Sequence, residues 1–120
     1  MATLTYSTLD TLLNLNSGVP AATLEEILDC AIDALNLYSR GDLPNMSGTA
    51  GSKSVSLDSG QAGAVKLVAR AIYHGFYKGI DTTTIQGMTL TAGDVLGNPA
   101  VLATLKEAAR QLAEPDVDVG

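Results

Sequence analysis

The stretch from Asp58 to Lys78, which reads DSGQAGAVKLVARAIYHGFYK, constrains the fold more than any other part of the chain because it predicts one long helix. Its apolar residues recur on two helical stripes, so this helix is expected to be contacted on two sides. Gly60, Gly63 and several alanines predict close approach by a neighbouring element. The first stripe is Ala62, Val65, Val68 or Ala69, Ile72 and Phe76, and the second is Ala64, Leu67 and Ala71.

Polar residues mark both ends of this predicted helix. Asp58 or Ser59 can cap its start, because a short side-chain oxygen accepts a hydrogen bond from an unpaired first-turn N–H. Gln61 stands three residues after Asp58, where the partner in a capping box is found. At the other end, Lys78 suits the negative end of the helix dipole and Gly79 can terminate the helix.

The composition fits a single small domain with a core of aliphatic side chains. The chain has 120 residues, 46% of them hydrophobic and 17% charged, which is typical of a globular protein. Aromatic residues make up only 4% and tryptophan is absent, so leucine, valine, isoleucine and alanine must build the core. The mean hydropathy of +0.20 is high for a small monomer, and it favours an apolar surface covered by other subunits.

The charge balance excludes several classes of function. A net charge of −6 argues against binding phosphate backbones and anionic membranes, both of which need an excess of lysine and arginine. No apolar run approaches the roughly 20 residues of a membrane span, and the N-terminus lacks the pattern of a signal peptide. Cys30 is the one cysteine, so an internal disulfide framework is excluded, and synthesis in a reducing cytosol is expected.

A second amphipathic helix is predicted to begin at a T-x-x-E capping box formed by Thr23 and Glu26. Its apolar stripe follows the helical period and leaves the acidic residues on a solvated face. That stripe is Leu24, Ile27, Leu28, Ala31, Ile32, Leu35 and Tyr38, and the acidic residues are Glu25, Glu26, Asp29 and Asp33.

Two further helices are predicted, one near each end of the chain. The N-terminal helix runs from Thr8 to Leu15 with Ser7 as its N-cap, and residues 1–7 before it are expected to form an extended arm. The last helix opens with Asn98 as N-cap and proline at its first position, and its apolar face extends to Leu112. Pro115 is expected to stop it.

The segments on either side of the central helix carry loop and strand signals. Residues 41–56 are rich in Gly, Ser, Pro and Asn, and a connection of this length is usually functional or mobile. Val55 and Leu57 alternate with serines and predict a short strand at its end. The threonine-rich segment 82–91 predicts a small hairpin or kinked strand, which must pair with Val55–Leu57 or with another chain.

The sequence therefore predicts a mainly α fold. Three to four helices surround the long central helix, and they are accompanied by the loop 41–57 and the small β element 82–91. Residues 1–112 form a single domain, and residues 113–120 form an acidic C-terminal tail.

No pattern in the sequence predicts a catalytic, cofactor-binding or metal-binding residue. Cys30 and His74 do not make a zinc site, which needs three or four ligands, and Cys30 is interpreted as a core residue. The acidic pairs are explained by a solvated face, without acid–base chemistry. The stretch SGTAGSK, residues 47–53, lacks the spacing of a phosphate-binding loop. Tyr73 and Tyr77 share a helix face, which favours core or interface packing over base stacking.

The order of these parts resembles that of the head–tail connector (adaptor) proteins of tailed bacteriophages. The resemblance rests on the segments TLEEILDCA, ARAIYHGFY and LGNPAV, and it covers most of the chain. It implies a structural virion protein that forms a ring, dodecameric in this family, beneath the portal protein in the phage neck. DNA would pass through the lumen of that ring without specific binding. The protein would be made in the host cytoplasm, and no enzymatic activity, cofactor or membrane is implied.

The resemblance also implies two contact regions. The portal-facing segment would run from Leu112 to the C-terminus and would use Leu112, Glu114, Pro115, Asp116, Val117, Asp118, Val119 and Gly120. Segments 41–57 and 82–91 would meet neighbouring subunits or a stopper or tail-terminator protein. The residues expected in those contacts, together with two tyrosines of the central helix, are Leu43, Met46, Lys53, Val55, Leu57, Tyr73, Tyr77, Ile85, Met88 and Leu90.

Two alternatives stay open at the level of sequence. The chain can be another neck or tail-completion protein of the stopper type, or it can be a small helical binding or regulatory module.

Overall fold

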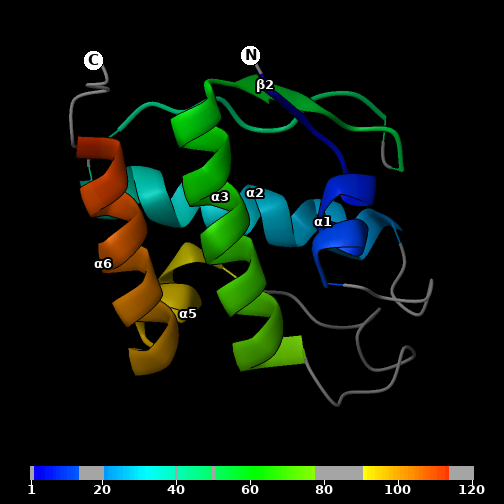
Figure 1. Cartoon of the computed structure of the whole chain (residues 1–120). Coiled ribbons are helices and arrows are strands. Elements are labelled where there is room, and N and C mark those ends of the chain that lie inside the picture. Colours follow the sequence, from blue (N-terminus) through cyan, green and yellow to red (C-terminus); the bar gives the residue numbers. More distant parts are fainter. Residues whose placement is uncertain (1, 14–20, 40, 50, 78–90, 114–120) are drawn as a thin grey trace.

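A computed structural model of the chain describes residues 2–13, 21–39, 41–49, 51–77 and 91–113, and it confirms a mainly helical fold with a small antiparallel sheet (Figure 1). In order, the elements are β1 (Ala2–Leu4), α1 (Tyr6–Leu13), α2 (Ala21–Ser39), β2 (Val55–Leu57), α3 (Ser59–Ile72), the π-helix η1 (Tyr73–Tyr77), α5 (Ala92–Leu96) and α6 (Pro99–Ala113).

Helix α3 is the central element, as predicted. Asp58 is its N-cap, and the Gln61 side chain accepts a hydrogen bond of 3.1 Å from the Asp58 N–H. After Ile72 the helix widens into η1, so the predicted single helix continues with a change of winding. Lys78 and Gly79 lie outside the described residues. In Figure 1, α6 stands beside α3, α2 crosses behind it and α1 lies on its other side, in agreement with the contacts between these helices.

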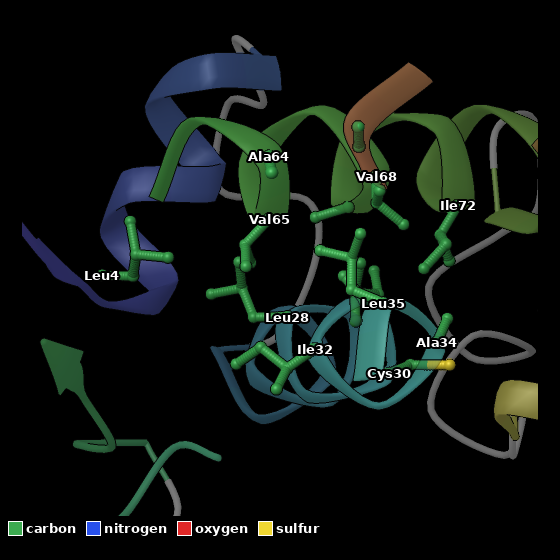
Figure 2. Close-up of a cluster of buried hydrophobic side chains, with 14 of the residues drawn as sticks. Leu4, Leu28, Cys30, Ile32, Ala34, Leu35, Ala64, Val65, Val68 and Ile72 are labelled. Carbon is green, nitrogen blue, oxygen red and sulfur yellow. The ribbon is translucent and has the colours of Figure 1, made fainter. Parts of the chain in front are cut away.

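The core lies between α3, α2 and α6. Figure 2 shows the side chains of Val65 and Val68 on α3 directed toward Leu28 and Leu35 on α2, and all four are fully buried. Complete burial of one such side chain is worth roughly 1.5–3 kcal/mol. Helix α6 completes the core with Val101, Leu105, Ala108 and Ala109. The first predicted stripe of α3 is thus confirmed as the core-facing side.

The start predicted for α2 is wrong. The helix begins at Ala21, so Thr23 lies inside it and is buried rather than serving as an N-cap. Ala21 and Ala22 have the highest helix propensity of any residue type, which favours extending the helix past the predicted start. The predicted apolar stripe is buried from Leu24 to Leu35, whereas Tyr38 at its end is 42% exposed.

The N-terminal helix is also displaced from its predicted start. Helix α1 begins at Tyr6 instead of Thr8, and Thr8 is the residue whose hydroxyl accepts a 3.1 Å hydrogen bond from the Thr5 N–H. The predicted extended arm is present as β1. Strand β1 pairs with β2 in antiparallel register, with Leu4 opposite Val55. Segment 82–91 was predicted to pair with Val55–Leu57 or with another chain, but the partner of β2 in the structure is the N-terminal arm.

The last residue of the segment predicted as β structure, Thr91, caps a helix in the structure. Residues 82–90 lie outside the described residues. Thr91 is the N-cap of α5, where its hydroxyl accepts a hydrogen bond from the Asp94 N–H and Asp94 accepts one from the Thr91 N–H. This reciprocal capping box fixes Thr91 at the start of a helix rather than in a strand.

The start predicted for the last helix is confirmed. The Asn98 carboxamide oxygen accepts hydrogen bonds from the N–H groups of Ala100 and Val101, at 3.0 and 3.2 Å, and Pro99 is the first helical residue. The portal-facing residues predicted from 114 to 120 lie outside the described residues, and Leu112 is half-buried near the end of α6. In the described part of the chain, no helix is both long and apolar enough to cross a bilayer.

The glycines of the central helix do not serve close packing inside the subunit. Among the described residues, a Cβ at Gly60 or Gly63 would meet nothing within 4 Å outside its own helix, so the close approach predicted there is not made by the described part of the chain. Close approach occurs instead at Gly75 in η1, where a Cβ would stand 2.9 Å from a methyl group of Val101. Gly63 is half-buried, and no other described element packs on it at Cβ distance.

Candidate functional site

Outside the core, the loop of residues 41–54 is held by a series of hydrogen bonds from side chains of α2 as it returns along one edge of that helix. The chain reverses after α2 through a hydrogen bond from the Gly41 N–H to the Asn36 carbonyl. It then runs antiparallel to the helix, so that loop residues successively later in the sequence meet helix residues successively earlier. Polar side chains of α2 hold the loop by its backbone at three levels.

The deepest of these contacts is made by Glu25. Its side chain is 1% exposed, and its two carboxylate oxygens accept hydrogen bonds from the N–H groups of Gly51, at 2.7 Å, and Lys53, at 2.9 Å. Hydrogen bonds to an ionised acceptor are roughly twice as strong as neutral ones. A buried carboxylate needs such partners, and here the loop backbone provides them.

The middle and near levels use two acids and one amide of α2. Asp29 accepts a 2.9 Å hydrogen bond from the Met46 N–H, and the Asn45 side chain donates to Asp33 at 2.9 Å. Asn36 forms a closed pair with the backbone of Leu43: its carboxamide oxygen accepts from the Leu43 N–H at 2.8 Å and its amide donates to the Leu43 carbonyl at 3.0 Å. The loop is thereby fixed along three turns of α2.

The far end of the loop is a small turn closed by a bridge between Ser47 and Ser54, whose backbones exchange hydrogen bonds of 2.9 and 3.0 Å. Gly48 and Gly51 adopt positive φ angles of 119° and 91°, which glycine accepts without strain. This geometry turns the Gly51 N–H toward Glu25 and leaves Thr49 exposed at the tip.

The prediction that the acidic residues of α2 form a solvated face is thus wrong for Glu25, which is buried. It holds only in part for Asp29 and Asp33, whose carboxylates also accept hydrogen bonds from the loop. The positions 25, 29, 33 and 36 share one edge of a helix, which the helical period makes visible in the sequence. A Gly- and Ser-rich segment follows that helix directly, so it offers unpaired N–H groups to the acids. That combination is the signal that points to a braced loop.

Several side chains predicted to contact neighbouring subunits are buried within the chain itself. These are Leu43, Met46, Val55, Leu57 and Tyr77, with exposures between 1% and 9%. Because the loop folds back onto α2 and β2 packs on α3, these apolar side chains join the core instead of the surface. Lys53 and Tyr73 are half-buried, and Ile85, Met88 and Leu90 lie outside the described residues. Contacts by this loop would use its exposed polar residues.

The two tyrosines predicted to share a face do so. The rings of Tyr73 and Tyr77 are nearly parallel, with centroids 6.5 Å apart and an interplanar angle of 4°. His74 is exposed and meets Tyr73 edge-on. Burial raises the pKa of Tyr77, and the nearby Glu26 carboxylate and Cys30 side chain add to this rise, which places the phenol against α2. Tyr77 therefore packs inside the subunit.

Cys30 is a buried thiol, as predicted. Burial, and after it the neighbouring carboxylates of Asp33, Asp94 and Asp29, together raise its pKa to about 12. A thiol with this pKa is protonated at neutral pH and is a poor nucleophile. Among the described residues, no cluster of three or more His, Cys, Asp or Glu side chains is placed to hold a metal ion.

An open groove of about 450 Å³ lies between α1 and α3, lined by Thr5, Ser7, Thr8, Thr11 and Lys66. It offers hydroxyl groups and one ammonium group to a polar partner. The described residues that line it include no carboxylate, histidine or cysteine that would activate a hydroxyl as a nucleophile.

Comparison of the chain with protein-family models, with curated proteins and with solved structures gave no match. The functional argument therefore rests on the residues and their geometry.

Proposed function

We propose that this chain is a structural subunit of a bacteriophage neck, an adaptor that forms a ring between the portal protein and the tail. In this role it would form part of the channel through which DNA passes, and it would reside in the virion after synthesis in the host cytoplasm. The proposal joins the resemblance in the order of segments to the physical features of the folded chain.

The observation that carries the proposal is the braced loop of residues 41–54. A long surface loop costs conformational entropy when a partner orders it, and that cost weakens binding. In this chain the loop is already ordered before a partner binds, because the carboxylates of Glu25 and Asp29 on α2 hold its backbone in one conformation. Such preorganisation suits a protein whose loop must present the same surface to a partner in every copy of a ring.

The charge of the chain is compatible with a DNA channel. With a net charge of −6, a ring of identical subunits would carry a large negative charge. DNA would be repelled weakly by such a lumen, whereas a basic lumen would bind it and oppose sliding.

The direct test is assembly with the portal protein encoded by the same genome. Mass photometry of the mixture is expected to show the mass of the portal ring increased by a full ring of this chain, and electron microscopy is expected to show that ring at the tail-facing end. A portal ring that keeps its own mass at saturating concentrations of this chain would rule the proposal out. Genes for portal, terminase and major capsid proteins are expected beside the gene for this chain.

A small helical binding module is the second candidate, and it is favoured by one observation. Leu37 and Tyr38 at the end of α2 are 60% and 42% exposed, which is unusual for adjacent large side chains in a chain that buries most of its apolar residues. A binding module would form a complex of fixed low stoichiometry with one partner, whereas the adaptor forms a ring. The same mass measurement separates the two.

A further inference from the structure

Two long helices that pack against each other, α2 and the continuous α3–η1 helix, carry side chains of opposite charge. Helix α2 contains four acidic residues and no Lys, Arg or His. The segment from Ser59 to Tyr77 contains Lys66, Arg70 and His74 and no acidic residue. This separation is sharp for a chain with nearly twice as many acidic as basic residues, 13 against 7.

On α2, the outward line is Glu26, Asp33 and Leu37. All three are exposed, whereas Leu28 and Leu35, on the opposite side of the helix, pack against α3 (Figure 2). The outward line therefore points away from α3. Asp33 uses one carboxylate oxygen for Asn45, and its other oxygen is available to a partner.

On α3, the outward line is Gly63, Lys66, Arg70 and His74. Arg70 and His74 are exposed, Lys66 is half-buried, and a side chain added at Gly63 would meet open space. Neither Lys66 nor Arg70 forms an ion pair with another described residue. This line points away from α2, because the residues on the other side of α3 form the core.

The two lines thus lie on opposite sides of the subunit and have opposite charge. A surface of this kind cannot pair with itself about a two-fold axis without placing like charges together. It can pair head-to-tail, with the acidic line of one copy on the basic line of the next, and a head-to-tail contact closes into a ring when the rotation allows.

We propose that the outward line of α2 on one copy docks against the outward line of α3 on a second copy, and that this contact links neighbouring subunits. The inference rests on the proposed ring and names the surfaces that form it. The occupant of each line is a second copy of this chain, argued from charge complementarity, which steers association and fixes register.

An antiparallel arrangement of the two helices matches the positions along both lines. Charges recur about once per turn on the α3 line, roughly every 5–6 Å, whereas Glu26 and Asp33 on the α2 line are two turns apart, with the buried Cys30 between them. When Leu37 lies over Gly63, Asp33 falls opposite Lys66 and Glu26 falls opposite His74. The open space above Gly63 then receives the most exposed large apolar side chain of the described residues. A parallel arrangement can also pair Glu26 with Lys66 and Asp33 with His74, but it places Leu37 beyond His74 rather than over the open space at Gly63.

Charge reversal tests the contact. The variant K66E/R70E makes the α3 line acidic, and E26K/D33K makes the α2 line basic. Each variant alone is expected to require roughly tenfold or more protein than wild type to assemble, in mass photometry or sedimentation. An equimolar mixture is expected to assemble again, because the acidic α3 line of the first variant fits the basic α2 line of the second. Thermal melting checks that both variants are folded.

If either variant alone assembles as wild type does, or if the folded variants fail to assemble when mixed, the inference is overturned. Because Lys66 is half-buried, the exposed pair R70E and D33K provides a second test by the same mixing design. The same assays with portal present separate the two proposals. A wild-type ring on the portal that tolerates both charge reversals would leave the proposed function standing and remove this interface. A chain that never assembles would remove both.

Disulfide trapping tests the register in a Cys30→Ala background. Mixing L37C with G63C under oxidising conditions is expected to give a cross-linked pair, whereas mixing E26C with K66C is expected to give little. Cross-linking of E26C with K66C in preference to L37C with G63C would overturn the antiparallel arrangement, and cross-linking of L37C to itself would show a two-fold contact and overturn the head-to-tail one.

Discussion

Glu25 and Gly51 are joined across 26 positions of sequence by a 2.7 Å hydrogen bond from the Gly51 N–H to the buried Glu25 carboxylate. The second oxygen of the same carboxylate accepts from the Lys53 N–H, so one side chain holds two backbone N–H groups of the turn at the loop tip. The loop and the helix are therefore one unit, and the first prediction concerns the residue that joins them.

Replacing Glu25 by alanine should destabilise the protein by about 2–3 kcal/mol, because two charge-assisted hydrogen bonds are lost and two N–H groups lose their partner. Urea unfolding in dilute protein measures this change. The neighbouring E26A variant is the matched control, because Glu26 is exposed and its loss should change stability by no more than about 0.5 kcal/mol. Equal effects of the two variants would contradict the role given to Glu25.

Two glycines of the central helix are expected to respond in opposite directions to alanine. Gly60 is exposed and its added Cβ meets open space, so Gly60→Ala should stabilise the monomer by about 0.5–1 kcal/mol through helix propensity. In η1, Gly75→Ala would bring a Cβ to 2.9 Å from Val101 and should destabilise by about 1–3 kcal/mol. Thermal melting of both variants decides, and a stabilising Gly75→Ala would show that η1 does not pack on α6 as described.

Cys30 should make stability fall at alkaline pH. Its pKa is raised from 9.0 to about 12 in the folded chain, so between these values the unfolded thiol loses its proton while the folded one keeps it. Stability from this group is complete below about pH 9 and is lost as the pH rises toward 12. The slope of the unfolding free energy is expected to reach at most about 1.4 kcal/mol per pH unit.

The window from about pH 9 to 10 isolates this effect, because Tyr77 begins to change stability only when its unfolded phenol titrates, near the ordinary pKa of 10.0, and its folded pKa is raised above that value. Cys30→Ala should flatten the slope in that window. A thiol reagent such as Ellman's reagent should label the native protein slowly at pH 8 and the urea-unfolded protein at once. Rapid labelling of native protein would show that the thiol is accessible, against its 5% exposure.

The sequence was most informative where structure depends on neighbours along the chain. The Asn98 cap, the core stripe of α3 and the aliphatic stripe of α2 were all predicted, because helical periodicity and capping act within a few residues. The pairing of β2 with the N-terminal arm was not predicted, because the two segments lie far apart in the sequence. Burial of Leu43 and Met46 was missed for the same reason: the loop that carries them is folded by acids 17 or more positions away, or by an amide seven positions back.

Asn36 provides the test that connects the braced loop to the proposed function. Its side chain both donates to and accepts from the backbone of Leu43, at 3.0 and 2.8 Å, and so fixes the point where the loop leaves α2. Asn36→Ala removes both bonds while leaving the Glu25 contacts in place. The amide of Leu43 should then exchange with solvent at least about tenfold faster, while the amides of the α3 core keep their protection.

If the preorganised loop presents the surface that a neck partner binds, the same variant should bind that partner more weakly with an unchanged melting profile of the helices. Ser39→Ala is the matched control, because the Ser39 hydroxyl donates a hydrogen bond to the Leu35 carbonyl at the end of the same helix and not to the loop. Unchanged binding by N36A, with faster exchange at Leu43, would separate the loop from partner recognition and leave the brace a purely structural device.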